Sequence, residues 1–328
     1  MEKEFFCVTD LVAERIKSGS IPGRRDDPYK IGLVVEGGGM RGVVPGGEIV
    51  GLQALDALKA FDAIYAVSAG AAAVVYGISG KAPEGTGIYY QDINNSNFID
   101  PRNLLKMKPA VNIPFLTHHV MLETKPFDWE KVVGSPIPLH IYTTDAVNCQ
   151  LVDLSENLNT ELQIADSLHY SSRIPVVAGM PVRVEDKYYT DGSALGDGIP
   201  LRQALADNCT HILALLSRPY GVNRTGMSPV DALGVAVLPW RFPKLAWHLF
   251  QKSRVYNRTL NSINMANSGM DSKARTITGV RIPSTYPIIS NLETDAEKLR
   301  NGAIAGYEVV MNTFKKYSLP IDTEVAVI

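Results

Sequence analysis

The chain has few cysteines and no long apolar run, and each shortage excludes a class of protein. Its three cysteines stand far apart in 328 residues and form no Cys-x-x-Cys pair: Cys7, Cys149 and Cys209. Neither a disulfide framework nor a zinc site is therefore indicated. No segment approaches the ~20 uninterrupted apolar residues of a membrane span, and the first residues contain no run long enough for a signal peptide. We expect a soluble, cytoplasmic protein.

The chain also lacks an excess of charge of either sign. It has 32 Lys and Arg against 34 Asp and Glu, a formal net charge of -2. Bulk charge therefore gives no reason to expect a nucleic-acid partner. Apolar residues make up 45% of the chain, which is typical of a globular protein with a sizeable core. The length suits one large α/β domain or two small ones.

Strand and helix patterns alternate from residue 29 onward. An apolar run predicts a strand over 30–35, helical spacing follows over 45–60, and a second strand and an Ala-rich helix follow over 61–67 and 69–79. Residues 81–136 are dense in Asn, Pro and Gly and predict loops and short helices. Alternation of this kind indicates an α/β fold with a mainly parallel sheet covered by helices on both faces. Later elements are expected as strands over 139–144, 150–153 and 211–217, a hairpin over 181–190, and helices over 158–170, 199–207 and 295–317.

A glycine-rich loop follows the first predicted strand. Residues 36–42 read EGGGMRG, so that Gly37, Gly39 and Gly42 formally satisfy the dinucleotide-binding pattern G-x-G-x-x-G. No acidic residue ends the second strand to hold a ribose, and no Gly-Lys-Ser/Thr closes the loop as in a P-loop. The pattern favours backbone amides that stabilise an oxyanion, with a glycine turn needed only for packing as the alternative.

A serine stands at the end of the second predicted strand. Residues 66–70 read AVSAG, which places Ser68 between small residues and directly before a helix. A serine pinched in this way can occupy a sharp strand-to-helix elbow with its hydroxyl exposed. The amides that begin the helix face a developing oxyanion. Taken alone, Ser68 is an ordinary serine at the end of a strand. The small residues that flank it, the helix that follows and the neighbouring glycine-rich loop favour a functional role.

The serine needs a base, and the six histidines are poor candidates. His211 opens a strand at the wrong end of the sheet, and the others are more often structural or solvated. Asp191 is better placed, because it follows the strand pattern of 187–190. Its Asp-Gly pair also suits a hairpin turn, but residues 195–200 do not continue as an alternating strand. We expect a Ser68–Asp191 dyad with concerted proton transfer, because a carboxylate is too weak a base to form a free alkoxide.

These motifs together resemble the patatin-like phospholipase family. That family is marked by Asp/Glu-Gly-Gly-Gly-x-Arg/Lys-Gly, then Gly-x-Ser-x-Gly, then Asp-Gly-Gly/Ala, and the chain has counterparts in this order at 36–42, 66–70 and 191–193. Residues 170–175 resemble the block before the family's catalytic aspartate. Residues 217–221, 254–257 and the last helix are similar to an uncharacterised bacterial branch. The resemblance covers about 31–317, almost the whole chain.

The resemblance implies a three-layer α/β/α sandwich and a serine acyl hydrolase of the lipase, phospholipase A or carboxylesterase type. Ser68 would be the nucleophile that carries the acyl group, and Asp191 its base, without metal or cofactor. Amides around Gly38 and Gly39, in the loop that also contains Gly37 and Gly42, would form the oxyanion hole. Arg41 would orient this loop or add positive charge. The expected regions are a helical lead-in and linker over 1–28, the hydrolase domain over 29–318 and a tail over 319–328.

Two positions depart from the family pattern. Ala66 replaces the first elbow glycine, while Gly70 keeps the second, and Ser193 replaces the small residue after Asp-Gly. The extra methyl of Ala66 crowds a position that often has little room for a Cβ. A catalytically weak or inactive lipid-binding or regulatory protein is therefore one alternative, and a Ser–His–Asp esterase that uses His248 is another.

A basic, aromatic segment lies within 225–270, which we expect to be helical and either lid-like or membrane-facing. Residues 238–260 contain Trp240, Trp247 and five Lys or Arg residues, with no acidic residue. Aromatic and basic residues in this mixture suit a helix at an anionic membrane surface, with a location peripheral to the membrane. The alternative is an amphipathic helix whose aromatic residues pack in the core.

Overall fold

The structure is a computed structural model that describes residues 7–196, 198–267 and 276–325. Parts of the expected lead-in, of the 225–270 segment and of the tail lie outside these residues. The first described helix, α1 (Val8–Ser18), packs on the body of the protein. Arg15 of α1 is buried and forms ion pairs with Asp27 at 2.8 Å and Asp62 at 2.7 Å. These contacts tie the lead-in to the strand that carries the elbow, because Asp62 directly precedes that strand.

The described strands form one mixed sheet. They are β1 (Ile31–Val35), β2 (Ala63–Val67), β3 (Leu139–Asp145), β4 (Gln150–Asp153), β5 (Val182–Val184), β6 (Lys187–Asp191), β7 (His211–Leu216) and β8 (Ile277–Arg281). Their order is β5-β6-β3-β2-β1-β7-β8, with β4 paired to β3. Neighbours from β3 to β8 in this order run parallel. The pairs β3–β4, β3–β6 and β5–β6 are antiparallel.

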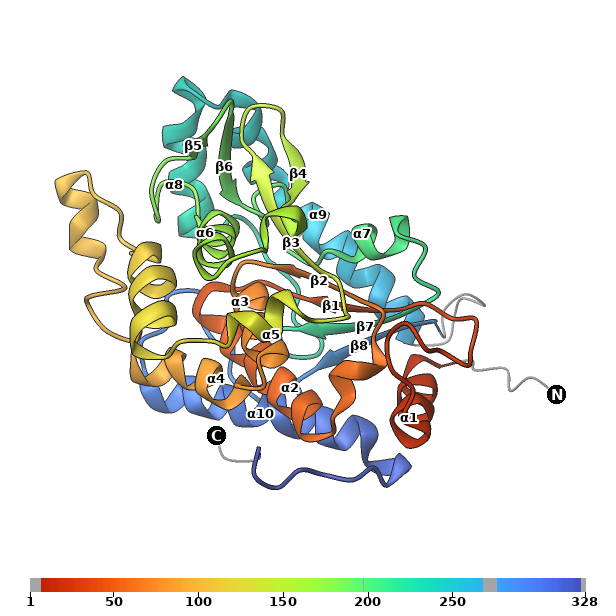
Figure 1. Cartoon of the computed structure of the whole chain (residues 1–328). Helices are drawn as coiled ribbons and strands as arrows, with labels where there is room; N and C mark the ends of the chain where they lie inside the picture. The colour runs from red at the N-terminus through yellow and green to blue at the C-terminus, as the bar shows by residue number, and fades with distance from the viewer. Residues whose placement is uncertain (1–6, 197, 268–275, 326–328) are drawn as a thin grey trace.

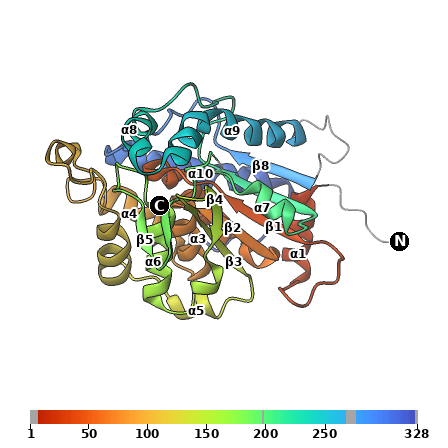
Figure 2. The ribbon, with the colours of Figure 1, turned by 90° about the horizontal axis from the view of Figure 1, so that it is seen from above.

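Helices cover both faces of the sheet, which gives three layers (Figures 1 and 2). Helices α2, α3, α4 and α10 lie on one face, and α7 and α9 lie on the other. None of the helices described is long and apolar enough to cross a bilayer. The helices after α1 are α2 (Val43–Ala54), α3 (Ala69–Ile78), α4 (Ala82–Gln91), α5 (Trp129–Val133), α6 (Glu161–Ser172), α7 (Leu201–Ala206), α8 (Pro229–Val237), α9 (Pro243–Asn267) and α10 (Ala296–Phe314).

Strand side chains alternate between two apolar cores. In β1, Leu33 and Val35 belong to the core that contains α2 and α10, whereas Val34 belongs to the core that contains α7 and α9. Both faces are therefore buried, which explains why β1 reads as a continuous apolar run in the sequence. The α/β fold with a mainly parallel central sheet and helices on both faces is confirmed.

Most predicted elements are present with shifted ends. The predicted helix 45–60 is divided, because α2 ends at Ala54 and a separate 3-10 turn spans Ala57–Ala60. Between them, Asp56 has a φ of 50°, which a continuous helix does not allow. Residues 81–136 contain α4, α5 and a π-helical segment, Phe115–Thr124. Strand β8 was not predicted from the sequence.

The tryptophans of 238–260 lie at the surface, so the alternative in which they pack in the core is wrong. Trp240 is 94% exposed at the end of a 3-10 turn, and Trp247 is 59% exposed on α9. The buried face of α9 is made instead by smaller or differently spaced side chains, among them Leu245, Leu249 and Leu260. These fill the helical stripe that meets the body, which leaves Trp247 at the surface of the helix.

Candidate active site

Ser68 occupies a sharp turn between β2 and α3. Its φ of 53° and ψ of -129° fall in a region that residues other than glycine rarely adopt. Such a conformation costs on the order of 1–3 kcal/mol and persists only where the surroundings hold it. The turn has the form of a nucleophile elbow, which supports the expectation for Ser68 drawn from the sequence.

The surroundings of the elbow are tight on both sides. Ala66 is fully buried in β2, and the turn forms with this methyl in place. A Cβ at Gly70 would lie 2.6 Å from the carbonyl oxygen of Glu36, so that only glycine lets α3 approach the end of β1 this closely. The chain therefore tolerates the departure at Ala66 but needs the glycine it keeps at Gly70.

Ser171 holds the backbone of the elbow from the side of β3. The backbone N–H of Ser68 donates to Ser171 Oγ at 2.8 Å, and that hydroxyl donates to the carbonyl of Tyr142 at 2.6 Å. The carbonyl of Ser171 accepts from the amide of Gly192 at 3.1 Å. One residue therefore bridges the elbow and the loop of Asp191. The sequence shows Ser171 only as part of the block 170–175, and nothing there signals this contact.

The glycine-rich loop presents free amides next to Ser68. The amide of Gly37 is used, since it donates to the carbonyl of Gly198 at 3.1 Å. The amides of Gly38 and Gly39 donate to no acceptor in the described part of the chain. Gly39 has a φ of 58°, and a Cβ there would lie 2.7 Å from the carbonyl oxygen of Asn291. Only glycine therefore allows this backbone conformation at position 39.

Arg41 anchors the loop from within the protein. Its guanidinium donates to Asn291 Oδ1 at 2.6 Å and to Ser217 Oγ at 3.0 Å, and its side chain is buried. Burial, followed by the charge of Arg218, lowers the pKa of Arg41 to about 10. Arg41 therefore remains protonated at neutral pH and adds positive charge behind the loop. Asn291 is a loop residue that carries no sequence signal.

Asp191 ends β6 and reaches the same level of the sheet as Ser68. Strand β3 supplies the link, because Tyr142 pairs with Val67 and the next residue, Thr143, pairs with Asp191. Strand β6 runs antiparallel to β3, and therefore to β2 as well. Its carboxyl end, Asp191, approaches the elbow from the direction opposite to that of β2. The side chain of Asp191 is buried and lines the same cleft as Ser68.

The carboxylate of Asp191 is held on one side and open on the other. Its Oδ1 accepts from the amide of Ser193 at 2.7 Å and from the Ser193 hydroxyl at 2.5 Å. Its Oδ2 has no donor among the residues that the structure describes, and no hydrogen bond joins Asp191 to Ser68 there. Contacts of this kind are commonly loose without substrate and close when it binds.

The histidines serve other contacts. His118, His119 and His140 pair with the carboxylates of Asp166, Glu123 and Asp153. His169 lies 2.9 Å from Arg173, and burial followed by the Arg173 charge lowers its pKa to about 4. His211 opens β7 opposite Ile31, far from the carboxyl end, as predicted. Within the described chain, no histidine lines either cavity at Ser68.

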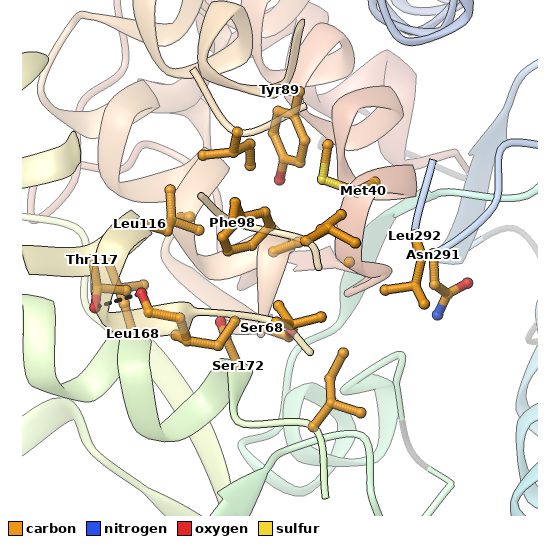
Figure 3. Close-up of a pocket in the computed structure, with 18 of the residues that line it drawn as sticks. Met40, Ser68, Tyr89, Phe98, Leu116, Thr117, Leu168, Ser172, Asn291 and Leu292 are labelled. Carbon is orange, nitrogen blue, oxygen red and sulfur yellow. Dashed lines mark hydrogen bonds between the residues drawn. The ribbon is translucent and has the colours of Figure 1, made fainter. Parts of the chain in front are cut away.

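Two cavities of different character meet at Ser68. One, which we call the apolar pocket, is lined mainly by apolar side chains, among them Met40, Phe98, Leu116 and Leu168 (Figure 3). The other, which we call the polar cleft, contains Asp191, the glycine-rich loop and several charged residues. Ser68, Gly39 and Asn291 line both. An apolar lining with a few convergent polar groups is typical of a ligand site.

Comparison with known proteins identifies one family. The family model described as patatin-like phospholipase matches residues 33–205, just over half of the chain. Among solved structures, the crystal structure of VipD from Legionella pneumophila is similar at 13% sequence identity and a TM-score of 0.44. The match covers 88% of this chain and 67% of that chain. No curated protein matches the chain.

Proposed function

The chain belongs to the patatin-like phospholipase family, and we propose that it hydrolyses lipid acyl esters with Ser68 as nucleophile and Asp191 as general base. Membership in the family supports lipid acyl hydrolase activity in general. The observation that carries the specific proposal is the strained Ser68 elbow, which shares one cleft with Asp191 and with the free amides of Gly38 and Gly39.

In the first half of the reaction, Ser68 Oγ attacks the ester carbonyl carbon while its proton passes to Asp191. The carbonyl oxygen becomes an oxyanion and accepts hydrogen bonds from the amides of Gly38 and Gly39. The bond to the alcohol oxygen then breaks, and Asp191 returns the proton to the departing alcohol. The acyl group remains on Ser68 as an ester.

In the second half, a water molecule attacks the acyl carbon and gives its proton to Asp191. The amides of Gly38 and Gly39 again hold the oxyanion. The bond to Ser68 Oγ breaks, the fatty acid leaves, and Ser68 regains its proton from Asp191. The enzyme returns to its starting state without metal or cofactor. Arg41 supports both halves by fixing the loop through Asn291 and Ser217.

The apolar pocket suits the acyl chain of the substrate. It begins at Ser68 and is walled by side chains such as Phe98, Leu116 and Leu168, so that a chain entering it leaves water (Figure 3). Each methylene group of the acyl chain that the pocket buries makes the free energy of binding more favourable by about 0.8 kcal/mol. The polar cleft then receives the alcohol half of the ester.

Two exposed surfaces suit contact with a lipid surface. Trp240 and Trp247 are accompanied by Phe250, which is 58% exposed, and by basic residues. A second surface is the segment 101–107, which projects from the body at the left of Figure 1 and exposes Leu105 by 90% and Met107 by 97%. Exposed aromatic and aliphatic side chains beside Lys and Arg are typical of peripheral membrane contact.

This surface contact can be tested by fluorescence. Anionic vesicles should shift the emission of Trp240 and Trp247 to shorter wavelength, and this shift should be smaller in Trp240→Ala and Trp247→Ala. An unchanged spectrum with vesicles would contradict the contact and leave hydrolysis of dispersed esters unaffected.

The catalytic proposal can be tested with p-nitrophenyl esters of several chain lengths. We expect turnover by the wild type and a loss of at least about a thousandfold in Ser68→Ala and Asp191→Asn, with folding checked by circular dichroism. Retained activity in Asp191→Asn together with its loss in His248→Ala would favour a Ser–His–Asp esterase. Vesicle binding with no turnover of any ester would favour a lipid-binding protein without catalysis.

A further inference from the structure

Two segments that contribute no reacting group to the catalytic proposal meet at the polar cleft. They are the segments 217–221 and 254–257, which lie far apart in the sequence. Arg218 from the first and Tyr256 from the second both line the cleft with Ser68. The guanidinium carbon of Arg218 lies 5.6 Å from the centroid of the Tyr256 ring, within reach of a cation–π interaction. The two segments therefore build one wall of the cleft.

Arg218 has spare hydrogen-bond donors. Its Nε is buried without an acceptor, and its side chain makes no hydrogen bond or ion pair with the residues described. The neighbouring cations, in contrast, are paired with a carboxylate. Arg224 forms an ion pair with Asp231 at 2.6 Å, and Lys252 lies 3.5 Å from the same carboxylate. A buried guanidinium donor without a partner is costly unless something else satisfies it.

The carboxylate of Glu36, which contacts this wall, already has hydrogen-bond donors on both oxygens. Glu36 accepts from the hydroxyl of Tyr256 at 2.9 Å through Oε1 and from the amide of Ser217 at 2.7 Å through Oε2. These bonds fix Tyr256, whose ring in turn faces the guanidinium groups of Arg218 and Arg224. The wall is therefore rigid, and it positions Arg218 without neutralising it.

A second cation, Arg41, lies close to Arg218. Its hydrogen bonds within the described residues go to neutral acceptors, which are Ser217 Oγ, Asn291 Oδ1 and the carbonyl of Ile289. After burial, the charge of Arg218 is the largest influence that lowers the pKa of Arg41. Two like charges near one cleft attract an anion, and a guanidinium fork matches the oxygens of a phosphate.

We propose that Arg218 binds a negatively charged, phosphate-type group on the alcohol side of the scissile ester. This inference rests on the proposed function, because the apolar pocket takes the acyl chain and leaves the polar cleft for the alcohol half. Arg218 is then a specificity-determining residue that selects acidic over neutral esters.

Matched soluble substrates test the selectivity. Octanoyl glycerol phosphate and octanoyl glycerol share an acyl chain and differ in the anionic group. We expect the wild type to prefer the phosphate ester, and the ratio of the two kcat/KM values to fall roughly ten- to a hundredfold in Arg218→Gln. Arg218→Lys should recover part of the loss. Arg202→Gln, on the exposed side of α7, is the control and should leave the ratio unchanged. An unchanged ratio in Arg218→Gln would overturn the inference.

Binding separates this inference from the catalytic proposal. Octyl phosphate and inorganic phosphate are titrated into Ser68→Ala, with and without Arg218→Gln, by calorimetry. Octyl phosphate should bind well below the concentration needed for inorganic phosphate, and at least about tenfold more weakly without Arg218. Arg218-dependent binding of octyl phosphate without any ester turnover would refute the catalytic proposal but not the phosphate site. Ester turnover with Arg218-independent binding, or equal affinity for both phosphates, would refute the substrate site alone.

Discussion

At the residue scale, Ser193 is the departure from the family pattern with the most direct chemical consequence. Its hydroxyl donates to Oδ1 of Asp191 at 2.5 Å, in addition to its own amide at 2.7 Å. Ser193→Ala removes the hydroxyl donor and keeps the amide, so that the carboxylate is less stabilised and accepts the Ser68 proton more readily. We expect kcat to rise roughly two- to tenfold with little change in KM. A lower kcat would show that the hydroxyl positions Asp191.

Glu48 gives a second residue-scale prediction, for stability. Its side chain is 0% exposed, and neither carboxylate oxygen has a hydrogen-bond donor among the residues that the structure describes. Burial, followed by the charge of Glu36, raises its pKa well above the ordinary value of 4.5. The folded protein therefore keeps this proton at a pH where the unfolded chain has lost it. The free energy of unfolding should fall as pH rises above about 4.5, by up to about 1.4 kcal/mol per pH unit.

Glu48→Gln should remove this dependence, because an amide does not titrate. Urea unfolding at about pH 5 and about pH 8 measures it, and the variant should gain stability relative to the wild type at the higher pH. An equal pH dependence in both proteins would contradict a protonated Glu48.

The sequence predicts some residues of the site and misses others for a clear reason. Ser68 and the glycine-rich loop are found because backbone geometry dictates their residue types within a few positions along the chain. Ser171 and Arg218 act through contacts with residues far away in the sequence, namely the elbow amide and the ring of Tyr256. No local pattern records such contacts.

At the element scale, the packing of α2 against α10 depends on two glycines. A Cβ at Gly306 would lie 2.2 Å from the carbonyl oxygen of Val44, and one at Gly47 would lie 2.0 Å from that of Ala303. The clashing atoms are backbone, so the helices must separate to relieve the overlap. Gly306→Ala should therefore lower the free energy of unfolding by about 1–3 kcal/mol.

A glycine in α4 provides the matched control. A Cβ at Gly87 would lie 3.1 Å from Gln91 Oε1, the end of a flexible side chain that can move. Gly87→Ala should be neutral or stabilising by up to about 1 kcal/mol, because alanine favours a helix. Thermal or urea unfolding measures both variants. Equal stabilities for Gly306→Ala and Gly87→Ala would show that the helices yield easily.

Helices and strands were predictable where their apolar residues recur at regular spacing and the same side chains are buried. Strands β1, β2 and β7 are buried on both faces and read as apolar runs, and α10 shows a clean helical stripe. The exposure of Trp247 was not predictable, because the position of an aromatic residue in the sequence does not reveal which side of α9 meets the body. Strand β8 ends the sheet through pairing with β7, which composition alone does not show.

At the scale of the whole molecule, the order of the strands assembles the site. The elbow lies on β2, the glycine-rich loop follows β1 beside it, and β3 carries Asp191 to the same level through its pairing with β6. The parallel core was predicted from the alternation of helices and strands. The antiparallel approach of β6 was not, because strand direction at the edge of a sheet depends on tertiary pairing.

The same assembly separates the two halves of an ester. The apolar pocket and the polar cleft lie on either side of Ser68 and share the end of the glycine-rich loop. Ser68 therefore borders an apolar space and a charged space at once. This arrangement fits a substrate that is apolar at one end and polar at the other, as lipids are.

The most direct test of the central claim is covalent labelling of the nucleophile. A fluorophosphonate should modify the wild type once, and peptide mass spectrometry should locate the label on Ser68. Labelling should be absent in Ser68→Ala and slower by at least about a hundredfold in Asp191→Asn, because in the proposed mechanism Asp191 accepts the proton as the serine attacks. A label on another residue, or an unchanged rate in Asp191→Asn, would contradict the Ser68–Asp191 dyad.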